Sequence, residues 1–160
     1  MILKPRQNCK EKNFFHLTNK KWAKEIILKP KTLDQLPLPN RCDDEPDFPK
    51  ICVAPTIEWC LVALAGHCWF SPILIYRTAE PAQSVKPWDV VDSDVTGERW
   101  ITQECKFIRV GQLGKVHLLE MRNRIMKDVG NFAPGCVDHL RLQKQALKII
   151  EKYIDRKSVV

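Results

Sequence analysis

The spacing of its prolines restricts how this chain can fold more than any other sequence feature. Five prolines fall between residues 28 and 49, at positions 30, 37, 39, 46 and 49. Proline lacks a backbone N–H and has a fixed φ, so this stretch cannot hold a regular helix or a central strand. We therefore predict a long loop over residues 28–50, and loops of this length in compact domains are usually functional or mobile.

Short segments on both sides of this loop have the residues of strands and helices. Aromatic and β-branched residues predict a strand over residues 13–18, and Asn19 is a suitable N-cap for a helix over residues 20–26. After the loop, the pattern predicts a strand over residues 51–54, a helix that begins behind Pro55 and ends at Gly66, and a strand over residues 73–78.

The second half of the chain predicts further strands and then helices. Two prolines and three aspartates make residues 79–95 an irregular segment. Strands are expected over residues 99–102, 105–110 and 115–119, while residues 118–128 also have a helical pattern. A break at residues 130–135 precedes a final amphipathic helix, which is predicted by apolar residues at 140, 147, 150 and 154.

Length and composition favour one domain. The chain has 160 residues, of which 44% are hydrophobic, so it can bury a core of its own. We predict a single α+β domain over residues 1–160, with a core over residues 13–119 and a basic helical extension over residues 120–160. The chain has no apolar run of about 18 residues and no secretory signal, which favours a cytoplasmic protein without a membrane partner.

The net charge of +7 lies at the two ends of the chain. Residues 1–31 carry nine Lys and Arg against two acids, and residues 120–157 carry nine against five, whereas residues 32–119 are acidic on balance. Basic ends can attract a phosphate-bearing ligand or a nucleic acid. An ordinary solvated lysine-rich surface explains the same charge, because no known nucleic-acid-binding motif accompanies it.

Neither cysteine nor metal chemistry is predicted. The seven cysteines are odd in number and irregular in spacing, so we interpret them as reduced thiols. Cys60, His67 and Cys68 are close together, but they lack a C-x-x-C pair and have apolar neighbours. Residues 92–97 imitate half of a calcium loop, yet Gln103 stands where such a loop needs glutamate. We expect no metal cofactor.

Two ionisable residues remain as candidates for chemistry, because the chain has no P-loop, Rossmann, zincin or nucleophile-elbow motif. His16 and Glu98 each lie at the edge of a predicted short strand. A histidine and a glutamate that face one cleft would suit a site that binds a ribose and stabilises positive charge on it. Each also has a structural interpretation, His16 as a backbone-bonded core residue and Glu98 as a solvated turn residue.

The order of several motifs resembles the superfamily of ADP-ribosyltransferases and RNA 2′-phosphotransferases. Phe-Phe-His-Leu-Thr at 14–18 and Leu-Lys-Pro at 28–30 are similar to its opening strand and its L-x-P turn. Residues 51–61 and 75–78 match the order of its next strand, helix and strand, and Thr-Gly-Glu-Arg-Trp at 96–100 stands where the transferases carry their glutamate. The resemblance spans roughly residues 13–110, and it implies a small split, antiparallel-rich β-core with flanking helices.

The resemblance implies an NAD-dependent transferase that cleaves the nicotinamide–ribose bond and passes ADP-ribose to an unknown acceptor. Glu98 would stabilise the oxocarbenium charge, and His16 would hold the ribose with Thr18 as a helper. Arg41, Arg77 and Lys20 would bind the pyrophosphate. The chain departs from the family where a tyrosine stacks on nicotinamide, since Val-Ala-Pro-Thr stands at 53–56, and Tyr76 or Trp100 would have to supply the ring.

Two other functions fit the same residues. The first is a non-enzymatic module that binds nucleic acid or protein through its basic surface, in which His16 and Glu98 are structural. The second is an enzyme similar to the RNA 2′-phosphotransferases, which also use NAD. The compact size is equally suited to a toxin, a phage-encoded effector or an accessory enzyme.

Overall fold

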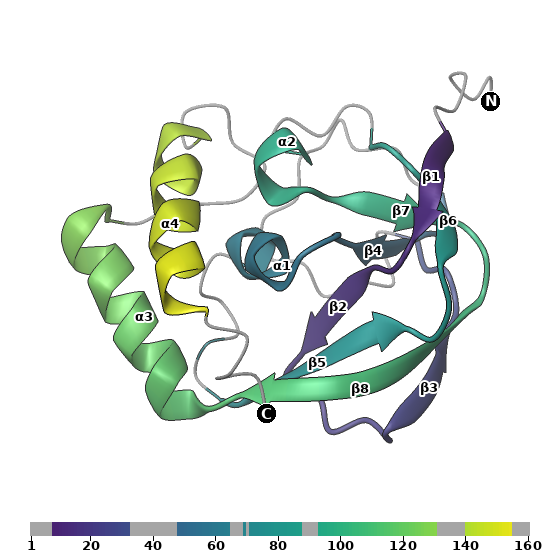
Figure 1. Cartoon of the computed structure of the whole chain (residues 1–160), viewed down its shortest axis with the longest axis horizontal. Helices are drawn as coiled ribbons and strands as arrows, with labels where there is room; N and C mark the ends of the chain where they lie inside the picture. The colour runs from purple at the N-terminus through teal and green to yellow at the C-terminus, as the bar shows by residue number, and fades with distance from the viewer. Residues whose placement is uncertain are drawn as a thin grey trace.

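The computed structural model describes residues 8–32, 48–64, 69, 71–87, 93–130 and 140–154, with side chains from residue 11 on. The described residues form an α+β domain with two antiparallel sheets of four strands and with four helices. In Figure 1 the helices gather at one end of the molecule, while the two sheets lie at the other end and face each other. The α+β prediction is therefore confirmed.

One sheet has the strand order β2-β5-β8-β3. Its strands are β2 (Phe15–Thr18), β5 (Ile73–Thr78), β8 (Cys105–Leu113) and β3 (Glu25–Leu28). β5 is buried at five of its six residues, as expected for a central strand with a continuous apolar run. In β3, by contrast, exposed and half-buried residues alternate, as expected for a strand at the edge of a sheet.

The other sheet has the strand order β1-β6-β7-β4. Its strands are β1 (Asn8–Lys12), β6 (Ala82–Val85), β7 (Arg99–Ile101) and β4 (Ile51–Val53). Two isolated bridges join this sheet to the first one. Ala54, directly after β4, pairs with Phe15 of β2, and Lys50, directly before β4, pairs with Lys31 beyond β3. β4 therefore lies against both edges of the first sheet, and the strands enclose a common interior.

Apolar residues from both sheets fill this interior. The smaller core cluster contains the following buried residues of β4, β5, β7 and β8 and of the chain directly before β2: Phe14, Ile51, Val53, Leu74, Tyr76, Ile101 and Phe107. Trp22, Ile26 and Leu28 pack against it. Because side chains alternate along a strand, the same β-strands send Leu17, Ile73 and Ile75 to the opposite side.

The four helices pack on that opposite side. They are α1 (Ile57–Leu64), α2 (Ser93–Thr96), α3 (Lys115–Asp128) and α4 (Leu140–Tyr153). α1 is the most apolar and lies between the sheets and α4 (Figure 1). The larger core cluster joins Leu61 of α1 to Met121 of α3 and Ile150 of α4, all fully buried. Residues beyond 120 thus contribute to the main core of the domain.

Three secondary-structure predictions were wrong. The predicted helix over residues 20–26 is a loop that leads into β3, because Glu25 to Leu28 pair with β8. The predicted strand over residues 115–119 is the first turn of α3, in which Leu118, Met121 and Ile125 share the buried face. The segment 79–95 contains β6 and α2 where irregular structure was predicted. The proline-rich segment 33–47 lies outside the described residues.

Candidate functional site

β2 carries His16 to the point where the two sheets separate. Phe15 and Ala54 exchange both backbone hydrogen bonds, at 2.8 and 3.1 Å, and beyond this pair β2 and β4 are no longer joined by a ladder. The side chain of His16 takes the next position, with Nδ1 lying 3.0 Å from the carbonyl oxygen of Cys52 in β4. The His16 side chain therefore bonds the Cys52 carbonyl, which would accept a backbone N–H if the ladder between β2 and β4 continued.

This contact sets the tautomer of His16. A carbonyl oxygen can only accept, so Nδ1 must carry the proton, and in the neutral ring Nε2 is then an acceptor. Among the described residues Nε2 has no hydrogen-bond partner. The ring is half-buried, so this nitrogen is available to a donor from a ligand, such as a hydroxyl group.

The surroundings of His16 keep it neutral. Burial lowers the pKa of His16 below its ordinary value of 6.5, the hydrogen bond to Cys52 acts in the opposite direction, and the positive charges of Lys20 and Lys31 lower the pKa further. Both lysines are exposed. The combination gives an uncharged acceptor beside two cations, which suits a ligand that carries both hydroxyl and phosphate groups.

Trp22 packs against His16. The two rings are nearly parallel, with an interplanar angle of 10° and centroids 5.7 Å apart, and Tyr76 meets Trp22 edge-on. The Tyr76 hydroxyl lies 2.7 Å from the carbonyl oxygen of Ala23 and 3.0 Å from that of Trp22, so its single proton holds this loop on β5. Trp22 is half-buried and can offer ring surface to a ligand.

Glu98 lies on the far side of β4 from His16. Cys52 pairs with Trp100 and Val53 with Arg99, so β4 lies between β2, which carries His16, and the segment that carries Glu98. The backbone N–H of Glu98 donates to Thr96 Oγ1 at 3.4 Å, and its carbonyl accepts from Arg99 Nη1 at 2.7 Å. A ligand that touches both residues must therefore lie across the end of β4.

The strands place the residues around Glu98 on two sides. Val53 and Ile101 face the interior that contains His16. Ala54 belongs instead to the larger core cluster, and the Trp100 ring packs edge-on against Phe48. Glu98 precedes the first residue of β7, and Gly97 turns the chain just before it with a φ of 64°. The short helix α2 and this turn thus fix where the glutamate enters the sheet.

The other predicted site residues are spread over the two faces of the first sheet. Tyr76 is directly opposite His16 in the ladder. Thr18 lies on the same strand as His16, and its Oγ1 accepts the backbone N–H of Lys20 at 3.1 Å. Arg77 pairs with Phe15 and so faces the opposite side, where its buried Nε has no acceptor within the described part of the chain. Arg41 lies outside the described residues.

Neither Tyr76 nor Trp100 presents a ring face to solvent, since both are fully buried. The Trp100 ring is covered by the buried ammonium group of Lys50, 4.4 Å from its centroid. Sequence reasoning missed Trp22, because it assigned this residue to a helix. The available signal was a tryptophan six residues after His16 in a lysine-rich stretch.

No cluster of three or more potential metal ligands occurs among the described residues. Within the same part of the chain, none of the helices has the length and apolar character that a membrane crossing requires. Cys52, Cys60 and Cys105 form no disulfide. Comparisons of the chain with models of protein families, with curated proteins and with solved structures found no match.

Proposed function

We propose that this protein is an NAD-dependent enzyme similar to the ADP-ribosyltransferases, and that NAD binds where β2 and β4 separate. The observation that carries the proposal is the state of His16, which is neutral, donates to the Cys52 carbonyl and leaves Nε2 as an acceptor. A ribose hydroxyl is a donor of the right kind for that nitrogen. The two four-stranded antiparallel sheets, which are joined between β2 and β4 only at the Phe15–Ala54 pair, are consistent with the split β-core that the sequence resemblance implies.

The residues beside His16 support a dinucleotide as the ligand. Trp22 supplies an aromatic ring next to the imidazole, which compensates for the missing tyrosine of the family pattern. Lys20 and Lys31 lie near enough to affect the titration of His16 and supply positive charge for a pyrophosphate. In this proposal NAD is a substrate, and the chain's own side chains supply the whole binding site.

The proposed chemistry is a glycosyl transfer. The bond between the ribose C1′ and the nicotinamide nitrogen breaks, its electron pair leaves with nicotinamide, and positive charge develops on the ribose. Glu98 is proposed to stabilise that charge across the end of β4, while His16 orients the ribose by accepting from its hydroxyl. The oxygen or nitrogen of an acceptor, or water, then forms the new bond to C1′ and loses its proton.

Release of nicotinamide from NAD by the purified chain tests the proposal. Glu98→Gln should lower the rate by a few hundredfold, because a preorganised charge of this kind is worth about 3 to 4 kcal/mol, and should leave NAD affinity nearly unchanged. His16→Ala should weaken NAD binding about tenfold through the lost hydrogen bond. Trp22→Ala should weaken it by a similar factor, and Trp22→Phe by much less.

Matched variants separate these effects from general damage. Glu120→Gln removes an exposed carboxylate from α3, and His117→Gln replaces a histidine that contacts the Tyr153 carbonyl on the helical side. Both should retain activity. If calorimetry detects no NAD binding to the wild-type chain at millimolar concentration, the proposal is wrong. If wild type and Glu98→Gln release nicotinamide at the same rate, Glu98 is not a catalytic residue.

A further inference from the structure

One face of α4 carries four cations in register. Arg141, Lys144, Lys148 and Lys152 follow one another at intervals of three or four residues and are all exposed. Residues three and four apart lie on the same side of a helix, so the four side chains form a single row, here called the basic stripe. The opposite face of α4 holds the buried Gln143, Ala146 and Ile150.

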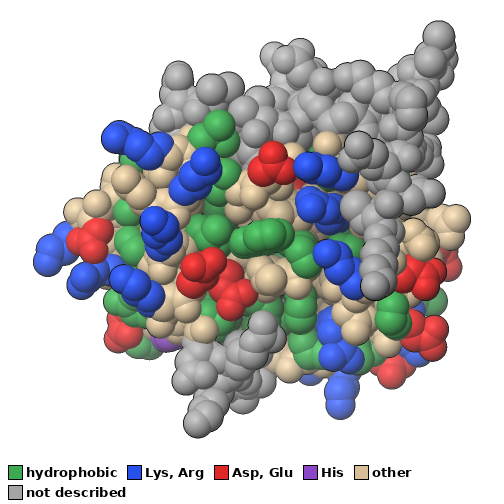
Figure 2. Space-filling model, turned by 45° about the horizontal axis from the view of Figure 1, so that its top comes forward, with side chains coloured by type: hydrophobic (Ala, Val, Ile, Leu, Met, Phe, Trp, Pro, Cys, Tyr) green, Lys and Arg blue, Asp and Glu red, His purple; other side chains and the backbone are tan. Residues whose placement is uncertain are grey.

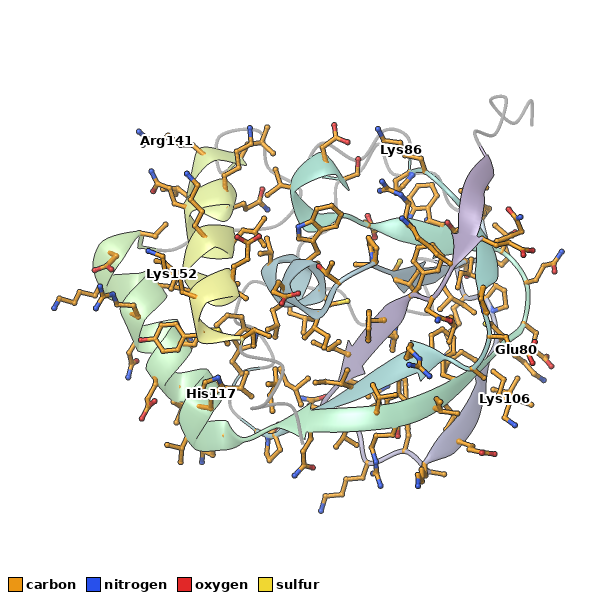
Figure 3. All side chains as sticks on the ribbon, in the orientation of Figure 1. Glu80, Lys86, Lys106, His117, Arg141 and Lys152 are labelled. Atoms are coloured by element: carbon orange, nitrogen blue, oxygen red, sulfur yellow. The ribbon has the colours of Figure 1, made fainter. Side chains whose placement is uncertain are left out.

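The stripe points away from the two sheets. Figure 3 labels Arg141 and Lys152 near the two ends of α4, and both side chains extend from the side that faces away from the sheets. In Figure 2 one group of Lys and Arg side chains lies over the helical end of the molecule, and a second group lies toward the other end. α3 and α4 together hold eight Lys or Arg residues against three acids, so this end of the molecule is strongly positive.

The charges of the stripe are not neutralised within the described part of the chain. Other surface cations have partners there, since Lys86 pairs with Asp94, Lys106 with Glu25 and Arg124 with Asp128. None of the four stripe residues forms an ion pair with a described residue. Four like charges about one turn apart repel one another, so the row is not explained by stabilisation of the helix.

The helix dipole also indicates that stabilisation of α4 does not explain the stripe. Cations stabilise the C-terminal end of a helix and destabilise the N-terminal end. Lys152 is in the last turn and is favourable, but Arg141 is in the first turn, which contains no acidic residue. The position of Arg141 is therefore unfavourable for the isolated helix.

The composition of the stripe selects the kind of partner. Protein interfaces depend on buried aromatic or aliphatic anchors, and membrane-binding helices insert apolar residues into the lipid. The exposed residues of α4 are all polar, because its apolar residues pack in the core. Binding to a phosphate backbone needs only cations in a row.

We propose that the basic stripe of α4 binds the phosphate backbone of a nucleic acid without reading its base sequence. The stripe spans eleven residue steps, or about 16 Å along the helix axis, and its four side chains can each reach one phosphate group. The proposal does not depend on NAD chemistry, because the stripe lies on α4 at the helical end of the domain (Figure 1), whereas His16 is a residue of β2 that contacts Cys52 of β4.

Fluorescence anisotropy with a labelled 20-nucleotide single-stranded DNA and the full-length chain tests the proposal. The variant in which Arg141, Lys144, Lys148 and Lys152 are all changed to Gln should bind at least tenfold more weakly at 50 mM salt. The plot of log affinity against log salt concentration should become less steep by about 3, since four phosphate contacts with single-stranded DNA contribute about 0.7 each.

A control of equal charge identifies the surface. Lys21, Lys24, Lys29 and Arg109 are exposed residues on the strand side of the molecule, and their change to Gln removes the same charge. This control should lower the affinity less than threefold. Circular dichroism should give native melting curves for both variants, because all eight residues are exposed.

Three results would overturn the proposal. The first is no binding of the DNA by the wild-type chain at 50 mM salt, and the second is an equal loss of affinity in the stripe variant and the charge-matched control. The third is equal competition by polyglutamate of the same charge or by vesicles with 30% phosphatidylserine, which would identify the partner as an acidic protein or a membrane.

Discussion

Gly97 lies directly against the indole ring of Trp59. Its φ is 64°, and a Cβ added at this position would overlap ring atoms of Trp59 in α1. Two independent physical reasons, backbone conformation and space, thus require glycine in the turn that leads to Glu98. The contact joins the start of β7 to α1 and so fixes the position of Glu98, which directly precedes β7.

Gly97→Ala should therefore destabilise the protein by about 2 to 5 kcal/mol, which combines left-handed backbone strain of about 1 to 2 kcal/mol with overpacking of about 1 to 3 kcal/mol. For a chain of this size the melting temperature should fall by roughly 10 °C. Gly114→Ala is the matched control, because a Cβ there meets nothing within 4 Å and φ is −72°. Equal melting temperatures for the two variants would contradict the steric argument.

The stability of the fold should decrease as the pH falls through about 6.5. The pKa of His16 is lowered in the folded state, so the unfolded chain binds more protons in this range, and acid shifts the equilibrium toward unfolding. The His16 contribution is complete above pH 6.5 and is lost as the pH falls toward the folded pKa. Urea titrations from pH 5 to 8 measure the slope of the free energy of unfolding against pH.

His16→Gln isolates this effect, because glutamine keeps a donor for the Cys52 carbonyl and does not titrate in this range. The variant should lose part of the pH dependence that the wild-type protein has. If the two proteins have the same slope between pH 5 and 7, His16 is not the group that couples protonation to folding.

The Tyr76 hydroxyl should contribute measurably to stability through the loop that carries Trp22. Tyr76→Phe removes the donor to the carbonyls of Trp22 and Ala23, which are partly buried, and should cost about 1 to 2 kcal/mol. Tyr153→Phe is a suitable comparison, because the hydroxyl of Tyr153 has no hydrogen bond within the described residues. Chemical denaturation monitored by tryptophan fluorescence measures the free energy of unfolding of both variants. If Tyr76→Phe lowers it no more than Tyr153→Phe does, the Tyr76 hydroxyl does not stabilise the fold through this loop.

Cys60 should resist alkylation in the folded protein. Burial raises the pKa of its thiol to about 12, and its Sγ donates to the Phe15 carbonyl at 3.4 Å. Thiolate is the reactive species, so iodoacetamide at pH 8 should modify the half-buried Cys52 and Cys105 well before Cys60. Mass spectrometry of peptides from native and urea-unfolded samples gives the comparison. Similar labelling of Cys60 in both samples would show that α1 opens readily.

The elements that the sequence predicted correctly are those whose pattern is local. The apolar run of β5 and the helical spacing of α1 and α4 depend on neighbouring residues, and the structure has all three close to their predicted bounds. β3 and the start of α3 were predicted wrongly because tertiary pairing decided them. Glu25 to Leu28 are strand residues because β8 offers them a partner, and Val116 is helical because Leu118 can then reach the core.

Sequence alone also singled out His16 and Glu98, since each is an ionisable residue beside a predicted strand. It could not find Trp22, whose position next to His16 depends on the loop held by Tyr76, or the carbonyl of Cys52, which lies 36 residues away. The neutral tautomer of His16 and its separation from Glu98 by β4 follow from how two sheets meet at Phe15 and Ala54. Local pattern determined most elements and the candidate residues. Only tertiary structure decided their surroundings, because burial, strand register and charge neighbours are set by residues that are distant in the chain.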